Sequence, residues 1–167
     1  FNQGVAAHKA GADVTMVTKL GRDSFADIAL NTMKELGMKQ DRILYSDDTE
    51  TGCALIMVDE NTSQNEIVVI LGSCNTISDA EVDSLEDLLD GCEYMLTQLE
   101  TNVSSVERIV NIACKKGVKV ILNTAPVQPI SDELLSKVDL ITPNEVEAEI
   151  LTGVKVDSEE AADKAAE

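Results

Sequence analysis

The stretch EYMLTQLETNVSSVERIVNIACKKGVKVILN, residues 93–123, decides the fold class of this chain. It opens with a short apolar run, Glu93 to Leu99, that has the length and composition of a strand. An amphipathic segment from Val103 to Lys116 follows and predicts a helix, which Gly117 ends. The β-branched run Val118 to Asn123 then predicts a second strand. A strand, a helix and another strand in this order predict two parallel strands joined by a right-handed crossover.

The same alternation continues on both sides of this stretch. The expected elements are a helix over Phe1 to Ala10, a strand over Asp13 to Leu20, a helix capped by Asp23 or Ser24 that runs to about Leu36, a helix from Ser78 to about Leu89, a short helix from Ser131 to Ser136, a strand from Val138 to Thr142, a helix from Asn144 to Leu151 and a helix opening at Ser158. This pattern predicts an α/β fold with a doubly wound, mostly parallel, Rossmann-like sheet and helices on both faces. A chain of 167 residues suits one domain.

One segment departs from the alternation of strands and helices. Gly52 to Val58 (GCALIMV) and Glu66 to Leu71 (EIVVIL) are both strand-like, and the polar DENTSQN between them is typical of a hairpin. We therefore expect an antiparallel β-flap over about residues 48–72, beside the main sheet. Few core contacts would hold such a flap, so its movement would cost little free energy.

The composition limits the classes of partner. The chain has 31 acidic and 13 basic residues and a formal charge of −18, so nucleic acids and anionic membranes would be repelled. Aromatic residues make up only 2% of the chain, which disfavours base stacking as a binding mode. No apolar run reaches the length that spans a membrane. We expect neither a nucleic-acid partner nor a membrane partner.

The cysteines and the missing motifs narrow the chemistry. The four cysteines form no C-x-x-C pair, which disfavours zinc and favours buried, reduced thiols in a cytoplasmic protein. There is no phosphate-binding G-x-x-x-x-G-K-[ST] loop and no G-x-G-x-x-G fingerprint, so a P-loop enzyme and an ordinary dinucleotide-binding protein are disfavoured. His8 is the only histidine and is expected at the surface, which leaves little basis for histidine catalysis.

Glu100 follows a predicted strand, at the edge where parallel sheets bind ligands. Its carboxylate can accept hydrogen bonds from ligand hydroxyls. Equally, it can cap the helix that begins near Val103. The residue alone does not decide between these two roles.

The segment TPNEVEAE, residues 142–149, allows two interpretations as well. Asn144 can cap the next helix, which is a complete structural explanation. Alternatively, Asn144 and Glu147 lie three residues apart on one helical face and offer oxygens to a hydrated Mg²⁺. Without further context, the capping interpretation is preferred.

Several segments together resemble the ribokinase-like (PfkB) sugar kinases. FNQGVAAHKAGADVTMVTKLGRDSFADIAL is similar to the N-terminal signature of that family, and TGCALIMVDENTSQNEIVVILGSCNTIS resembles its β-flap and the return from it. LTQLE, LNTAP and DLITPNEVEAEILTG follow in the family's order and spacing. ITPNEVEAE, which matches the N-x-x-E motif, is the most specific of these segments. The resemblance covers essentially the whole chain and is closest to the ribokinases.

The resemblance implies ATP-dependent phosphorylation of a sugar hydroxyl, with ribose as the first candidate. Asn2 matches the signature residue that contacts sugar hydroxyls, and Glu100 matches the acidic residue that contacts the sugar from a strand end. Ala54 and Ile56 match flap positions that close over the sugar. The family resemblance also implies a homodimer formed through the flap.

The resemblance assigns the remaining positions to the nucleotide side and to the flap. Asn144 and Glu147 match the pair that influences Mg²⁺ and phosphate binding, largely through water, with Glu147 on the metal side. Gly72 and Asn75, in the return from the flap, match positions of weaker effect. A monovalent cation is implied for the full-length protein.

The chain also departs from the family pattern. The opening strand with its Asp and the Gly-Gly turn are missing before Phe1, which is not a Met, so we expect the true N-terminus to lie further upstream. The second signature, D-T-x-G-A-G-D, supplies the family's catalytic Asp and is expected beyond Glu167. We therefore assign no catalytic residue within the chain and expect a partial domain, 1–167, that is inactive alone. The alternative is a non-catalytic binding or assembly domain of the same fold.

Overall fold

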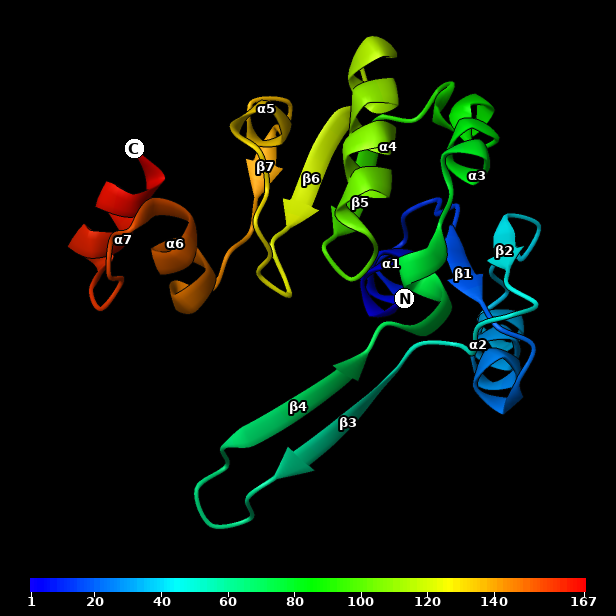
Figure 1. Ribbon diagram of the computed structural model, residues 1–167, viewed down its shortest axis with the longest axis horizontal. Helices are drawn as coiled ribbons and strands as arrows, with labels where there is room; N and C mark the ends of the chain where they lie inside the picture. Colours follow the sequence, from blue (N-terminus) through cyan, green and yellow to red (C-terminus); the bar gives the residue numbers. More distant parts are fainter. The chain divides into compact units, whose positions relative to one another are not determined.

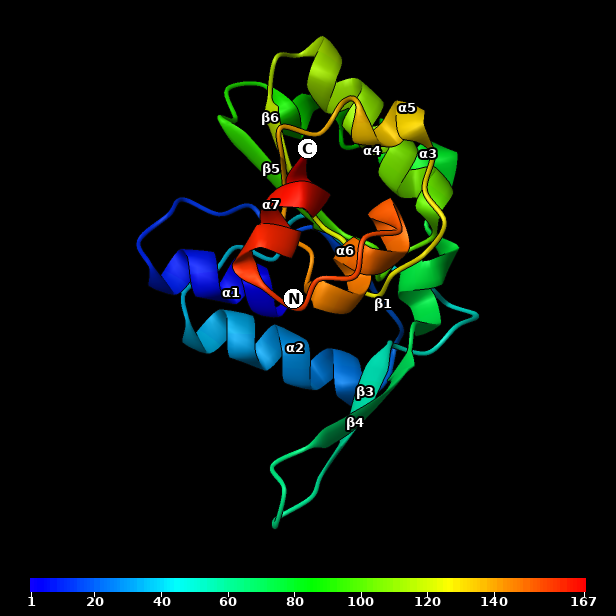
Figure 2. The ribbon, with the colours of Figure 1, turned by 90° about the vertical axis from the view of Figure 1, so that its left-hand side faces the viewer.

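The computed structural model describes all 167 residues and divides them into two compact units, unit 1 over Phe1–Ile77 and unit 2 over Ser78–Glu167. Figure 1 shows the chain with its elements labelled, and Figure 2 shows the same ribbon turned by 90°. Each unit combines helices with parallel strands, and unit 1 also carries an antiparallel hairpin. The predicted α/β class is confirmed. None of the helices combines the length and the apolar character that crossing a bilayer requires.

Unit 1 begins with two helices and two short parallel strands. They are α1 (Asn2–Lys9), β1 (Thr18–Leu20), α2 (Ser24–Glu35) and β2 (Ile43–Tyr45). β1 pairs with β2 in parallel, from Thr18↔Ile43 to Leu20↔Tyr45. The buried core of this unit consists of Met16, Leu20, Ala26, Met33, Met38 and Ile43. The half-buried His8 lies within 2.9 Å of the Leu36 carbonyl oxygen through its Nε2 and so ties α1 to the end of α2.

The strands of unit 1 differ from the prediction in length and number. The predicted strand over Asp13–Leu20 is too long. Only Thr18–Leu20 pairs with a neighbouring strand, so only these residues form β1. That partner, β2, was not predicted, because three residues, Ile43–Tyr45, are too few to show a period of two. The predicted helix α2 is confirmed, with Asp23 rather than Ser24 as its N-cap.

The predicted flap is confirmed as a hairpin. Its strands are β3 (Cys53–Val58) and β4 (Asn65–Ile70), which pair antiparallel from Cys53↔Ile70 to Val58↔Asn65. At the tip, the Asp59 carboxylate accepts hydrogen bonds from the backbone amides of Asn61 (2.7 Å) and Thr62 (3.3 Å). The short helix η1 (Gly72–Thr76) leads the chain away from the flap.

Unit 2 contains a three-stranded parallel sheet. Its elements are α3 (Asp79–Asp83), η2 (Glu86–Leu89), β5 (Tyr94–Gln98), α4 (Val103–Lys115), β6 (Lys119–Asn123), α5 (Asp132–Leu135), β7 (Leu140–Ile141), α6 (Glu145–Thr152) and α7 (Glu159–Ala166). The strand order is β5-β6-β7, with both pairs parallel. Helix α4 buries Val106, Val110 and Ala113 against β6, whose Val120 and Leu122 are fully buried. The predicted strand–helix–strand unit over residues 93–123 is therefore confirmed.

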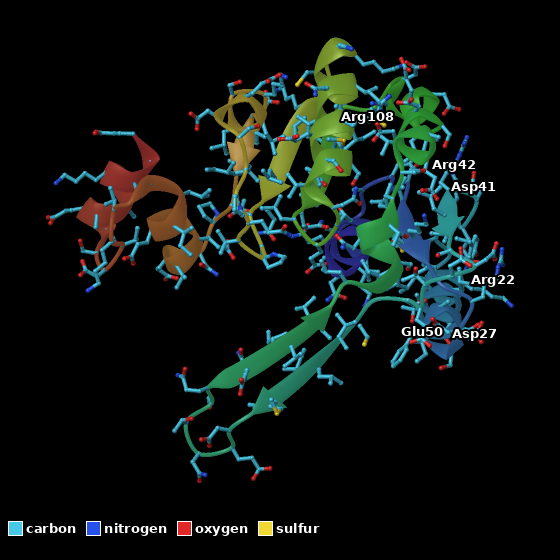
Figure 3. The ribbon with its side chains drawn as sticks, in the orientation of Figure 1. Arg22, Asp27, Asp41, Arg42, Glu50 and Arg108 are labelled. Atoms are coloured by element: carbon cyan, nitrogen blue, oxygen red, sulfur yellow. The ribbon has the colours of Figure 1, made fainter.

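The predicted helix from Ser78 to Leu89 is wrong in its middle. It divides at Ser84 into α3 and η2. This segment carries many carboxylates, and like charges four residues apart destabilise a continuous helix. Arg108 on α4 pairs with Asp83 through Nε–Oδ1 and Nη2–Oδ2, each at 2.7 Å, and this hydrogen bonding holds the pKa of Asp83 below its ordinary value. Figure 3 labels Arg108 beside this acidic segment.

Two further expectations for the chain need correction. The strand predicted over Val138–Thr142 is reduced to Leu140–Ile141, which pairs with Ile121–Leu122 of β6. The four cysteines are free, as predicted, but none is buried: Cys53 and Cys74 are half-buried, and Cys92 and Cys114 are exposed. The exposed pair lies after η2 and near the end of α4, where the helices face solvent.

Candidate functional site

The carboxyl ends of three neighbouring strands meet along one edge of unit 2. Because β5, β6 and β7 are parallel neighbours, the residues that follow them lie along this edge. Glu100 follows β5, Thr124 follows β6, and Asn144 follows β7. Ligands of open parallel sheets bind at such an edge. These residues therefore form the candidate site of unit 2.

Glu147 is held at this edge by a closed set of hydrogen bonds. Its side chain is buried, with 7% of its surface exposed. Oε2 accepts hydrogen bonds from Thr124 Oγ1 and from the Asn144 backbone amide, each at 3.0 Å. Oε1 accepts one from Asn144 Nδ2, also at 3.0 Å. Burial without an opposite charge is expensive unless donors compensate it, and three donors do so here.

The same contacts start helix α6. Asn144 Oδ1 accepts from the Glu147 backbone amide at 2.8 Å, and the Glu147 carboxylate accepts from the Asn144 amide in return, which is a capping box. Glu145 and Glu147 stand in the first turn, where the helix dipole favours negative charge. Gly153, at φ 74°, ends the helix in the left-handed conformation. The capping interpretation of Asn144 is confirmed.

The geometry of Glu147 fits a cation held through water better than one bound directly. A carboxylate has about four acceptor positions. Three are used by Thr124 and Asn144, and the remaining one is on Oε1. Magnesium keeps several waters in its shell, and one of these can donate to that position. Nowhere does the structure gather three or more His, Cys, Asp or Glu side chains into a group that would hold a metal ion by itself.

Glu100 is exposed and remains free for a ligand within its unit. The N-cap of α4 is Asn102, so Glu100 does not cap this helix and the capping interpretation is wrong. Asn102 is itself engaged, since its Nδ2 donates to Ser104 Oγ at 3.0 Å and its carbonyl accepts from Ser105 Oγ at 2.8 Å. The Glu100 carboxylate makes no hydrogen bond or ion pair. An exposed carboxylate at a strand end can accept hydrogen bonds from ligand hydroxyls.

The other candidate residues lie in unit 1. Asn2 is the first residue of α1 and is exposed. Ala54 and Ile56 are exposed on the flap, and they share one of its faces because side chains alternate along a strand. Gly72 and Asn75 belong to η1, at the return from the flap. The structure thus describes the flap residues and Asn2 in one unit, and Glu100, Asn144 and Glu147 in the other.

Sequence reasoning assigned no role to Thr124. Its side chain is fully buried, and its hydroxyl donates to Glu147 across 23 positions of sequence. Its place directly after a strand was visible in the motif LNTAP. The partner was not visible, because the contact depends on β6 and β7 being neighbours.

Asp23 caps α2, as the sequence allowed, and it also has a second partner. Its Oδ1 accepts from the Ala26 backbone amide at 2.9 Å, and its Oδ2 accepts from the Thr51 backbone amide at 2.6 Å. The amides of Thr51 and Ala26 hold the pKa of Asp23 below its ordinary value. The carboxylate therefore connects α2 to the chain that enters the flap.

Comparison with known proteins identifies what the chain is similar to. The model of the pfkB family carbohydrate kinase matches residues 1–167. The ribokinase of Haemophilus influenzae is 44% identical over 165 residues, which cover 99% of this chain and 54% of that protein. The deoxyribokinase of Salmonella typhi is 35% identical over 158 residues, which cover 94% of this chain and 51% of that protein.

A solved structure gives the same result for the fold. The structure of Arabidopsis thaliana ribokinase complexed with ribose and ATP superimposes with a TM-score of 0.83 at 25% identity, over 99% of this chain and 54% of the other. The chain thus spans about half the length of the curated relatives it matches.

Proposed function

Because this chain belongs to the pfkB family of carbohydrate kinases, we propose that the protein containing it transfers the γ-phosphoryl group of ATP to a sugar hydroxyl, with ribose as the first candidate. The observation that carries this proposal is the 44% identity to a ribokinase over 99% of the chain. The solved complex of the Arabidopsis thaliana ribokinase with ribose and ATP supports both substrates. A relative named deoxyribokinase makes 2-deoxyribose the nearest competitor.

The sugar would be bound by residues whose polar or apolar side chains are exposed. Glu100 accepts hydrogen bonds from sugar hydroxyls, since its exposed carboxylate has no partner within its unit. Asn2 supplies a second polar contact from the start of α1. Ala54 and Ile56 cover the sugar from the flap, whose closure excludes water during transfer.

The nucleotide side of the proposal rests on Asn144 and Glu147. Mg²⁺, when bound, neutralises charge on the transferring phosphate. Glu147 would hold one of its waters through the free position on Oε1, while Asn144 and Thr124 keep the carboxylate in place. A monovalent cation is expected from the family resemblance alone.

The reaction itself needs a group outside this site. The sugar oxygen forms a bond to the γ-phosphorus while the bond from phosphorus to ADP breaks, and the hydroxyl proton passes to a carboxylate base. We propose that this base belongs to the half of the relatives' length that the chain does not span. The isolated 167-residue chain would then bind ligands without catalysing transfer.

The first test is an assay of the full-length protein with ATP and a panel of ribose, 2-deoxyribose, fructose, adenosine and 2-keto-3-deoxygluconate. Ribose is expected to give the highest kcat/KM, and the isolated chain is expected to give no transfer. Turnover on none of these acceptors would contradict the kinase proposal. Transfer by the isolated chain would contradict the proposal about the base.

The same assay tests Glu100. We expect Glu100→Gln to raise the KM for the sugar about tenfold, because a hydrogen bond to a charged acceptor is replaced by one to a neutral acceptor. The control is Glu93→Gln, since Glu93 is also exposed but precedes β5 instead of following it. Equal KM values for both variants would remove Glu100 from the sugar site.

We also propose that the flap joins two copies of the chain. Leu55 and its cross-strand partner Val68 are 59% and 45% exposed, on the face opposite Ala54 and Ile56. Apolar surface of this kind on both faces of a ribbon favours burial against another protein. Sedimentation of the full-length protein at micromolar concentration should give a dimer, and a single monomeric species would contradict this.

A non-catalytic binding or assembly domain remains the second candidate, and the exposed flap is the observation that favours it. A dimer with no turnover on the acceptor panel would support this candidate over the kinase. A cytoplasmic location is part of the main proposal, since the four cysteines are free and ATP is the donor. Recovery of the protein from an oxidising compartment, with disulfides formed, would contradict that location.

A further inference from the structure

The flap cannot set its own direction. Apart from Cys53, every side chain of β3 and β4 is exposed, so the hairpin has no core. A two-stranded hairpin is only marginally stable by itself. Figure 1 shows the ribbon running outward from its attachment in unit 1. Its orientation within that unit therefore depends on the contacts at its attachment.

We call the chain just before β3 the entering limb of the flap, and the chain just after β4 the leaving limb. The entering limb is tied to the turn between β1 and α2. The Thr51 backbone amide donates to Asp23 Oδ2 at 2.6 Å, and Thr51 Oγ1 accepts from the Gly21 amide at 2.8 Å. The backbones approach so closely that a Cβ at Gly21 would lie 2.7 Å from Thr51 N and 2.8 Å from Thr49 O. Only glycine fits there without a shift of the neighbouring backbone.

The limb that leaves the flap is tied to β1 and to the entering limb. Ser73, which is fully buried, donates from Oγ to the Lys19 carbonyl at 2.7 Å. The buried Lys19 donates from Nζ to the Thr76 carbonyl at 2.8 Å. The Ser73 amide donates to Glu50 O at 2.8 Å, which joins the two limbs. We call Gly21, Asp23, Thr51 and Ser73 the flap base.

Asp23 is the member of the flap base with two separable roles. One oxygen starts α2 by accepting from Ala26, and the other holds Thr51. A cap needs only one acceptor. The second oxygen is therefore not required by the helix, and it accepts from the Thr51 amide of the flap limb.

We propose that Asp23 is a positioning residue for the sugar site: its carboxylate ties the entering limb to the first turn of α2 and so fixes the direction from which Ala54 and Ile56 reach the sugar. This inference rests on the proposed function for its effect on the sugar. Its structural part, the control of the flap by Asp23, does not require that function.

The test uses Asp23→Ser in the full-length protein. Serine caps helices as well as aspartate does, but it has a single side-chain oxygen, so α2 keeps its cap while Thr51 loses its acceptor. We expect amide hydrogen exchange across residues 53–70 to quicken about tenfold. We also expect the KM for the sugar to rise by about as much, and by more than kcat falls.

A second variant and a control complete the design. Thr51→Ala leaves the Asp23 cap in place and removes the bond from Gly21, so it should change exchange in the same direction by a smaller factor. Asp139→Ser removes a similar carboxylate bond, to the Val120 amide at 2.8 Å in unit 2, and should leave the hairpin's exchange unchanged.

The outcomes separate this inference from the proposed function. Wild-type exchange of the hairpin in both flap-base variants would overturn the inference. Faster exchange without any change in KM would overturn the part that concerns the sugar. If the protein phosphorylates no acceptor, the exchange experiment still decides whether Asp23 controls the flap.

Discussion

Glu147→Ala is expected to lower the free energy of unfolding by about 2–4 kcal/mol, because it leaves buried donors without an acceptor. The Thr124 hydroxyl has no exposed surface and would lose its partner. The Asn144 amide would lose the return bond of the capping box. Chemical denaturation of the full-length wild type and variant measures this loss. The denaturant dependence of the unfolding free energy is compared between the two proteins, so that a change in the midpoint can be read as a change in stability.

The same substitution should also slow phosphorylation of the sugar about 10- to 100-fold, as is typical when a residue that orients a metal's ligands is removed. The matched control is Glu149→Ala on the same helix, since Glu149 is exposed and its side chain has no partner. The control should change stability by less than about 0.5 kcal/mol. Equal losses in both variants would contradict the structural role of Glu147, and full activity of Glu147→Ala would remove it from the nucleotide side.

Gly72→Ala is expected to cost about 2–5 kcal/mol of stability, from two separate causes. Gly72 has φ +53°, a conformation that strains any residue with a Cβ. A Cβ there would also lie 2.5 Å from Glu50 O and 2.6 Å from Gly52 N. Neither of these atoms is a flexible side chain, so the two limbs of the flap would have to move apart.

Gly37→Ala separates these two causes. Gly37 has φ +71°, but a Cβ there would meet nothing within 4 Å, so this variant carries only the conformational strain of about 1–2 kcal/mol. The excess cost of Gly72→Ala over Gly37→Ala measures the close approach of the limbs. Equal costs in thermal or chemical unfolding would show that the approach is not tight. A rise in the KM for the sugar is expected for Gly72→Ala alone.

The sequence predicted those elements whose signals are local. The α4 segment shows an apolar stripe and a terminal glycine, and α6 shows a cap three residues before a glutamate. The flap could be predicted because two β-branched runs flank a polar turn. Such signals lie within a few positions of each other in the sequence, so they can be recognised without knowledge of the tertiary structure.

What the sequence did not predict depends on partners far along the chain. Strand β2 exists because β1 lies beside it, and three residues carry no readable period. Asp83, beside the break at Ser84, pairs with Arg108, which lies on a later helix 25 positions along the chain. Likewise, Asp23 could be recognised as a cap, but its bond to Thr51 spans 28 positions.

The candidate site follows the same division. The N-x-x-E pair was recognised, and its local geometry agrees with the capping interpretation. Its burial against Thr124 was not predicted, since it requires the order of β6 and β7. Glu100 could not be separated from a cap by sequence, because Asn102 stands only two residues away and starts the helix instead.

The unpaired strand edges of the flap make the protein prone to aggregation. Residues 67–70 read IVVI, an uncharged β-branched run on a strand whose outer backbone groups are unpaired by any third strand. Such edges template the growth of intermolecular sheets, and charged residues beside them act as gatekeepers. Three carboxylates act as gatekeepers here: Glu66 at one end of the run, and Asp59 and Glu60 at the tip of the hairpin. Replacing these three carboxylates by neutral amides is expected to make the protein form fibrils more readily than the wild type.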